Sequence, residues 1–183
     1  MKRTADLLFE ARMLKDLERS GYAFLGNGTE SVAEHCFSMA FICWVMARTV
    51  PDIDRERLLS MALVHDMAEA RTGDFNYVQK KYARVDEAGA LSHLVGDLPF
   101  GPEITALVAE FNAGETREAR LAKDADQLSF ILELKKLKDT GRSFPGQWLE
   151  VIAARLKTDT GKQMAADILE TRWDNWWLDG YSE

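Results

Sequence analysis

Apolar residues recur at the spacing of an α-helix through nearly the whole 183-residue chain. In the segment 3–19 the leucines and alanines follow a period close to 3.6 residues, which predicts a first amphipathic helix over 3–19. The letters SVAE at 31–34 have the spacing of a capping box, which predicts a helix over 32–48. No segment shows the alternation of a half-buried strand. The pattern therefore predicts an all-α fold, with residues 1–183 forming a single domain.

Proline, glycine and capping residues divide the rest of the chain into further helices. Pro51 ends the helix over 32–48, Asp54 can cap a helix over about 55–70, and Gly73 closes that segment. Downstream, the sequence predicts a polar helix over 77–95, a helix that begins at Pro102, a long helix over 116–138 and, after the break TGRSFPG, two more helices.

The composition limits the partners of the chain. A formal net charge of −7 argues against nonspecific binding to a nucleic acid polymer, but not against a small anion held by a metal and one or two local cations. We find neither an apolar run of about 18 residues nor a signal peptide, so no membrane partner is expected. Cys36 and Cys43 lie about 10 Å apart along one predicted helix, too far for a disulfide. These features predict a reduced, cytoplasmic protein with both cysteines in its core.

Two further features have no clear role from the sequence. Trp173, Trp176 and Trp177 share one helical face, which predicts either packing on the core or a subunit interface. His93 lies in a polar helix away from any motif, and we expect it to have no catalytic role.

Four ionisable residues stand where predicted helices change from apolar to polar. His35 lies on the first turn of the capped helix, His65 and Asp66 end the third helix, and Asp126 lies within the long helix. Buried groups of this kind need partners or a metal to offset desolvation. Two imidazoles and two carboxylates form a suitable ligand set for one divalent Mn, Co, Fe, Zn or Ni ion.

Two more acids follow the His-Asp pair. Glu69 comes four residues after His65, and Asp74 follows Gly73 where the helix has ended. They are either solvated surface acids or part of the site. A purely structural metal site needs neither of them, so their presence favours catalysis.

The segments ESVAEH, HDMAEARTGD and KDADQL resemble those of the HD-domain metal-dependent phosphohydrolases. Within that superfamily they resemble the small 5'-deoxynucleotidases, over a motif-bearing core of about 14–140. The resemblance implies an orthogonal helical bundle, one divalent metal, a homodimer and removal of the 5'-phosphate from deoxynucleoside monophosphates.

The resemblance also assigns roles by position. Asp126 is preferred to Asp124 because it stands three residues after Lys123, as the ligand of the family does after its lysine. Lys123 itself is either a cation near the site or a solvated lysine. The implied metal ligands are His35, His65, Asp66 and Asp126.

Glu69 and Asp74 fall on catalytic acids of the family. Arg19 falls on a substrate-contacting arginine, and Tyr22 stands where relatives often have tryptophan. At the expected substrate rim, FNYVQKKY lacks prolines that some deoxynucleotidases have, and LGNGTE lacks an arginine found in many relatives. These departures leave the base preference open.

The leading mechanism is metal-assisted hydrolysis of a phosphomonoester. Glu69 would orient or deprotonate the attacking water, Asp74 would protonate the leaving oxygen or help with the water, and Arg19 would bind the phosphate. Two alternatives remain. One is another HD-type nucleotide hydrolase, although HDMAEA has Ala70 where alarmone hydrolases have a second acid, and the GYP segment of cyclic-dinucleotide phosphodiesterases is absent. The other is a non-enzymatic dimeric module with a structural metal site.

Overall fold

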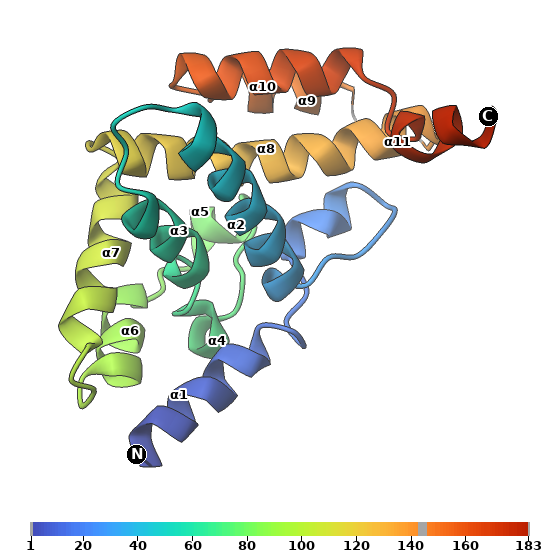
Figure 1. Cartoon of the computed structure of the whole chain (residues 1–183). Helices are drawn as coiled ribbons and strands as arrows, with labels where there is room; N and C mark the ends of the chain where they lie inside the picture. Colours follow the sequence, from blue (N-terminus) through green and yellow to red (C-terminus); the bar gives the residue numbers. More distant parts are fainter. Residues whose placement is uncertain (1, 143–145, 183) are drawn as a thin grey trace.

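The computed structural model describes residues 2–142 and 146–182, and every regular element in these ranges is a helix (Figure 1). The predicted all-α fold is therefore confirmed. The elements are α1 Lys2–Met13, η1 Ser20–Phe24, α2 Val32–Thr49, α3 Arg55–Val64, α4 Glu69–Thr72, α5 Gln79–Tyr82, α6 Glu87–Val95, α7 Gly101–Ala113, α8 Arg117–Asp139, α9 Gln147–Ala153, α10 Asp159–Glu170, α11 Asn175–Leu178 and η2 Asp179–Ser182.

The long helix α8 is the centre of the fold. Helices α2, α3 and α7 pack against it, and α9 and α10 also contact it. Figure 1 shows α10 lying along α8. Fully buried Leu128, Ile131 and Leu134 of α8 join the main core with Met39, Met46 and residues of α3. A smaller apolar cluster lies between α1, the start of α2, α4, α6 and α7.

The capping box predicted at the start of α2 is present. Ser31 Oγ accepts a hydrogen bond from the amide of Glu34, whose carboxylate accepts one from the amide of Ser31. The helix buries His35 in its first turn, and its cysteines, Cys36 and Cys43, are free and buried. The core placement expected for both cysteines is confirmed.

The first helix ends at Met13 and not near residue 19 as predicted. The chain leaves the helix there because the carbonyls of residues 14 and 17 accept hydrogen bonds from the first amides of α2. Those amides have no partner within their own helix. The amide of Val32 donates to Leu17 O at 2.9 Å, and that of Ala33 donates to Leu14 O at 3.0 Å. The segment after α1 is thereby fixed beside the helix that carries His35.

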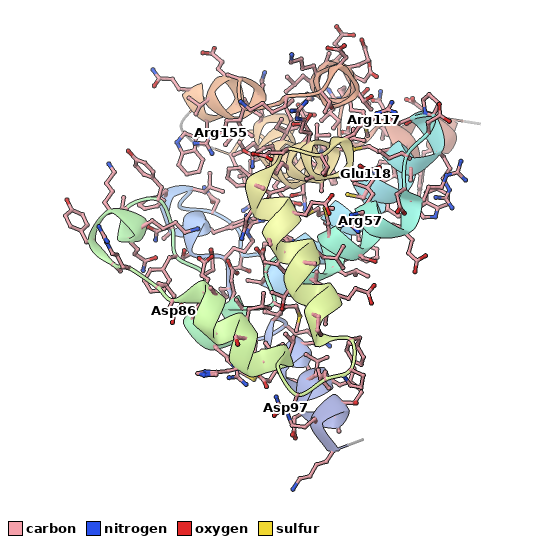
Figure 2. The ribbon with its side chains drawn as sticks, turned by 90° about the vertical axis from the view of Figure 1, so that its left-hand side faces the viewer. Arg57, Asp86, Asp97, Arg117, Glu118 and Arg155 are labelled. Carbon is pink, nitrogen blue, oxygen red and sulfur yellow. The ribbon has the colours of Figure 1, made fainter. Side chains whose placement is uncertain are left out.

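The helix predicted over 55–70 is interrupted at the His-Asp pair. Helix α3 ends at Val64, and α4 begins only at Glu69. Between them the backbone tightens, because Met67 N donates to Val64 O and Glu69 N donates to Asp66 O, each three residues back. The start of α3 is tied to α8 through Asp54 N, which donates to the Glu118 carboxylate; Figure 2 labels Glu118 near Arg57.

The polar helix predicted over 77–95 is two helices, α5 and α6. Side chains that bind the backbone locally explain the break. The Asn76 side chain accepts from the amide of Gln79, and Asp86 accepts from the amide of Gly89 as the cap of α6 (Figure 2).

The later helices largely follow the sequence. Pro102 lies in the first turn of α7, and Thr116 caps α8 through the amide of Ala119. Part of the predicted break TGRSFPG, residues 143–145, lies outside the described residues. Two helices were expected after it, whereas the structure has α9, α10, the short α11 and η2.

The tryptophans near the end of the chain do not form the buried face that core packing would require. Trp176 is 82% exposed and Trp177 is also exposed. Trp173 is half-buried, and its amide donates to Asp139 at the end of α8. Among the described residues, no helix is both long and apolar enough to span a bilayer.

Candidate metal and substrate site

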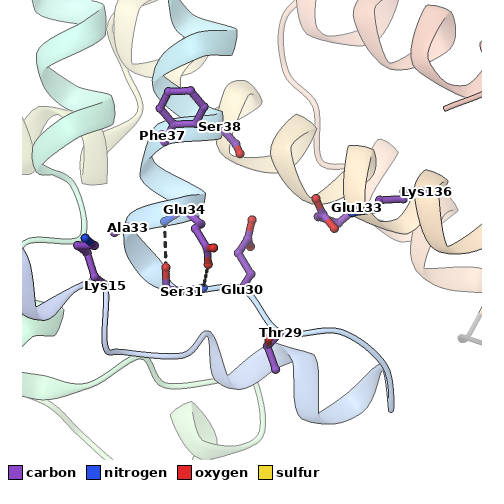
Figure 3. A pocket seen from close by; sticks show the side chains of 10 residues that line it. All are labelled: Lys15, Thr29, Glu30, Ser31, Ala33, Glu34, Phe37, Ser38, Glu133 and Lys136. Atoms are coloured by element: carbon purple, nitrogen blue, oxygen red, sulfur yellow. Dashed lines mark hydrogen bonds between the residues drawn. The ribbon is translucent and has the colours of Figure 1, made fainter. Parts of the chain in front are cut away.

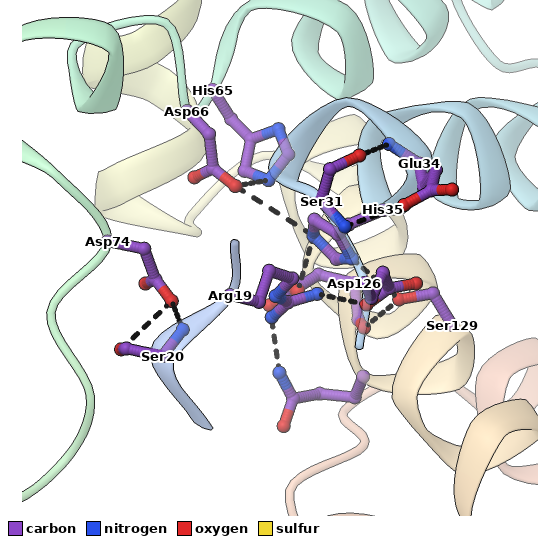
Figure 4. A network of polar contacts seen from close by, with 12 residues as sticks. Arg19, Ser20, Ser31, Glu34, His35, His65, Asp66, Asp74, Asp126 and Ser129 are labelled. Atoms are coloured by element: carbon purple, nitrogen blue, oxygen red, sulfur yellow. Dashed lines mark hydrogen bonds and ion pairs between the residues drawn. The ribbon is translucent and has the colours of Figure 1, made fainter. Parts of the chain in front are cut away.

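The four predicted metal ligands converge where α2, the end of α3 and α8 meet (Figure 4). His35 Nε2 lies 3.2 Å from Asp126 Oδ1 and 3.9 Å from Asp66 Oδ2. His65 Nε2 lies 3.0 Å from that same Asp66 oxygen, and the two imidazole centroids are 5.5 Å apart. Residues separated by 91 positions in the sequence therefore share one small polar centre.

The orientation of His65 is set by its surroundings. Its ring centroid lies 4.8 Å from that of Phe111. Its Nδ1 lies 3.1 Å from Ala62 O, and because a carbonyl only accepts, Nδ1 carries the hydrogen. In the neutral ring the lone pair is then on Nε2, which faces Asp66. Lys123 lies over the Phe111 ring, with its Nζ 4.7 Å from the centroid.

These residues fit a divalent cation. His35 is 1% exposed, and its Nε2 has no hydrogen-bond partner although Asp126 is close. Ligand atoms of His35, His65 and Asp126 lie within 4.8 Å of one another. A buried ring nitrogen without a partner is costly, and a cation at this point would satisfy it together with the adjacent carboxylates.

Cys36 also has its sulfur within 4.8 Å of ligand atoms of His65 and Asp66. Burial, assisted by the charges of Asp66 and Glu69, raises the pKa of the Cys36 thiol far above its ordinary value. Because metals bind the thiolate, this protonated thiol is a poor ligand. The imidazoles and carboxylates remain the natural ligand set.

The charges of the centre are paired. Burial opposes ionisation of Asp126, but His35 and the charges of His65 and Arg19 outweigh it, so the pKa of Asp126 lies below its ordinary value. Burial likewise opposes protonation of His65, yet adjacent Asp66 raises the pKa of His65 above its ordinary value. Asp126 is therefore held as a carboxylate by the imidazoles and Arg19, and the shift of His65 reflects the negative charge of the adjacent carboxylates, which also attracts a cation.

A cavity of about 230 Å³ opens beside this centre. Six predicted site residues line it: Arg19, His65, Asp66, Glu69, Asp74 and Asp126. Lys80, Glu87 and Asn112 line it as well, and sequence reasoning missed all three. They belong to no motif, although Lys80 lies in the segment FNYVQKKY, which was expected at the substrate rim.

Glu69 is the acid most affected by this environment. Burial, together with the charges of Asp66 and Asp74, raises the pKa of Glu69 to about 9. Its Oε2 is buried and has no hydrogen-bond partner. A carboxyl group in this state retains its hydrogen-bonding capacity for a water or a substrate in the cavity, and a bound cation would favour its ionised form.

Asp74 and Arg19 are held by the segment that follows α1. Asp74 Oδ2 accepts from Ser20 N at 2.7 Å and from Ser20 Oγ at 3.1 Å (Figure 4). Arg19 N donates to Glu30 O at 2.8 Å, and its guanidinium lies 3.5 Å from the Glu30 carboxylate. The only signal for Ser20 in the sequence was its position next to Arg19.

Tyr22 and His93 lie elsewhere. Tyr22 is absent from the described lining of the cavity; its buried ring packs edge-on against Phe130, with centroids 6.4 Å apart. Its role in substrate binding therefore stays a prediction. His93 lies on α6, where its carbonyl accepts from Arg3.

A larger groove of about 590 Å³ lies between α2 and α8 (Figure 3). Its lining mixes acids and lysines, among them Glu30, Glu133 and Lys136. None of the four predicted metal ligands lines it. The smaller cavity beside His65 is therefore the one with chemistry suited to a metal-bound substrate.

A family model described as "HD domain" matches residues 11–168. The chain belongs to the HD domain family. Among curated relatives, the 5'-deoxynucleotidase HDDC2 of Danio rerio is 33% identical over 134 residues, which cover 69% of this chain and 65% of that protein. The Xenopus laevis protein of the same name is 30% identical over 170 residues, 87% of this chain and 82% of its own length.

Solved structures share this fold, among them the HD domain-containing protein YGK1, which is 19% identical and superposes with a TM-score of 0.67 over 93% of this chain and 85% of that one. A conserved hypothetical protein from Pyrococcus furiosus is 29% identical and superposes with a TM-score of 0.76. The match covers 91% of this chain and 99% of that structure. The helical bundle expected from the HD-type motifs is therefore confirmed.

Proposed function

We propose that this HD domain protein is a metal-dependent phosphohydrolase that removes the 5'-phosphate from deoxynucleoside monophosphates. The observation that carries the proposal is the convergence of His35, His65, Asp66 and Asp126 beside a cavity that also contains Glu69. The curated relatives named 5'-deoxynucleotidase support this substrate class.

His35, His65, Asp66 and Asp126 are the residues that would hold the metal. When bound there, a divalent ion neutralises phosphate charge and lowers the pKa of a coordinated water. Three of the four residues line the cavity, and the fourth, His35, is buried against Asp126. A substrate in the cavity is therefore placed next to the centre that holds the ion.

Glu69 and Asp74 supply the proton chemistry in this proposal. Glu69 orients or deprotonates the attacking water, which requires its ionised form beside the cation. Asp74 protonates the leaving ribose oxygen or assists with the water. Ser20 binds one oxygen of Asp74 with two hydrogen bonds, which fixes the carboxylate at the cavity wall.

Arg19 is the candidate phosphate-binding residue. Its backbone and side chain are both held by Glu30, and it lines the cavity. Burial opposes the charge of its guanidinium, but Asp126, Glu30 and Asp66 raise the pKa of Arg19 above its ordinary value. A planar guanidinium fixed in this way can bind two phosphate oxygens.

The nucleotide assay tests the proposal. Phosphate release should be faster, in kcat/KM, from deoxynucleoside 5'-monophosphates than from matched ribonucleotides, because a 2'-hydroxyl adds steric or desolvation cost. The assay should be run with Mn²⁺, Co²⁺, Fe²⁺, Zn²⁺, Ni²⁺ and Mg²⁺. A transition metal should restore the chelated enzyme better than Mg²⁺, which prefers oxygen ligands.

Three results of this assay would contradict the proposal. Equal kcat/KM for deoxy and ribo substrates would indicate a general nucleotidase or another HD-type hydrolase. Full activity after exhaustive chelation, with no metal found by elemental analysis, would remove the metal mechanism. No phosphate release from any nucleotide would favour the non-enzymatic module.

We also propose that the protein is a cytoplasmic homodimer. The free, buried cysteines of α2 support a reducing compartment. Exposed aromatic side chains on α2, Phe37, Phe41 and Trp44, support burial against a second copy. Light scattering of the purified protein should give twice the chain mass, and a monomer mass at micromolar concentration would contradict the dimer.

A further inference from the structure

Ser129 is a buried polar residue of α8 that no motif indicates. It is 2% exposed and stands three residues after Asp126. Its Oγ lies 2.8 Å from the carbonyl oxygen of Asp126 and 3.0 Å from His35 Nδ1. The hydroxyl therefore connects two of the predicted metal ligands on the side away from the metal centre (Figure 4).

The single hydrogen of this hydroxyl determines where the hydrogen of His35 lies. The Asp126 carbonyl can only accept, so the Ser129 hydroxyl donates to it. Ser129 Oγ then offers only a lone pair to His35, and Nδ1 must be the donor. A neutral imidazole has one N–H group, so the lone pair of His35 is left on Nε2.

The surroundings of Nε2 agree with this assignment. Nε2 is buried, makes no hydrogen bond, and lies 3.2 Å from Asp126 Oδ1 and 3.9 Å from Asp66 Oδ2. A lone pair on Nε2 can bind a cation together with these carboxylates, whereas a hydrogen on Nε2 would occupy the position that a metal needs. His65 reaches the same tautomer through the carbonyl of Ala62, so both imidazoles present Nε2 to the centre.

We propose that Ser129 is a positioning residue that holds His35 in the tautomer and orientation needed to bind a divalent cation. The proposal deepens the proposed function and rests on its metal site. Ser129 acts through His35 and does not line the cavity. The corresponding contact of His65 is made by a backbone carbonyl, which substitution does not remove. Ser129 is therefore the side chain with which control of a histidine tautomer can be tested.

The test is metal affinity of the chelated, metal-free protein, measured by calorimetric titration with Co²⁺ and with Mn²⁺. Ser129→Ala should weaken binding about 10–100-fold, the usual effect of removing a group that orients a metal-binding histidine. Ser129→Thr keeps the hydroxyl and should recover most of the affinity. Ser38→Ala, one turn beyond His35 on α2 and lining the larger groove, is the matched control and should bind as the parent does.

A second measurement does not depend on any variant. Long-range ¹H–¹⁵N spectra of the metal-free parent should show His35 with its hydrogen on Nδ1, the signals being assigned by their loss in His35→Asn. The Nε2–H tautomer would overturn the proposal, as would unchanged metal affinity in a folded Ser129→Ala protein. If the parent binds no divalent ion, or binds it yet releases no phosphate from nucleotides, the proposed function fails, whatever the tautomer of His35 is.

Discussion

Replacing Glu69 by glutamine should lower kcat by about 10²–10⁴-fold while the metal content and the fold remain those of the parent. Glu69 lines the cavity and is not one of the four proposed ligands, which converge beside it. Glutamine keeps the shape of the side chain but cannot accept a proton from water. The measurement is phosphate release and metal content on the same purified sample.

Asp126→Ala is the matched comparison, because it removes a proposed ligand. It should lose metal and activity together, whereas Glu69→Gln should lose activity alone. Near-normal turnover in Glu69→Gln would show that Glu69 only lines the cavity. That result would refute the assigned catalytic role but not the proposed metal site. Retention of both metal and turnover in Asp126→Ala would refute the ligand set.

Asp124→Ala should cost about 2–4 kcal/mol of unfolding free energy, because it leaves buried donors without an acceptor. Asp124 is 1% exposed and accepts from Lys157 N, from Thr158 N and from Thr158 Oγ1, at 2.6–2.8 Å. For a domain of this size the loss corresponds to a fall in Tm of roughly 5–15 °C, measurable by calorimetry. Metal affinity at a temperature where the variant is folded should stay close to that of the parent.

Gly161→Ala tests the same contact from the other side. A Cβ at Gly161 would lie 2.3 Å from Asp124 Oδ2, so the carboxylate would have to move from its donors. This variant should also lower Tm. A parent-like Tm in both variants would show that the Asp124 contact adds little to stability, and loss of metal in folded Asp124→Ala would mean that the wrong aspartate had been assigned.

Local chemistry explains what the sequence could predict. Ser31, Asp54 and Thr116 each cap a helix by binding an amide three residues away, so the sequence contains both partners of the contact. The candidate metal ligands could also be predicted from the sequence, because His65 and Asp66 are adjacent and His35 follows a capping box. Choosing Asp126 over Asp124 needed the resemblance to the HD family, and the structure places only Asp126 at the cavity.

Contacts between distant residues explain the rest. The hydroxyl of Ser129 meets His35 across 94 positions, and Ser20 meets Asp74 across 54, so no spacing rule connects them. The end of the first helix could not be predicted for the same reason, since it depends on a contact with a distant segment. Residues that continue a helical pattern beyond Met13 instead supply carbonyls to the first amides of α2, a competition that only the folded chain reveals.

The separation in sequence between Asp124 and its hydrogen-bond donors also affects how the chain folds during synthesis. Every proposed ligand precedes residue 127, whereas the amides that bind Asp124 come 33 and 34 residues after it. Until the amides of Lys157 and Thr158 have left the ribosome, the Asp124 carboxylate must stay hydrated. The face of α8 that carries Asp124 therefore cannot be buried before then. A nascent chain that has not reached Thr158 thus contains the whole ligand set and the helices α2, α3 and α7 that pack on α8, but Asp124 still lacks its donors.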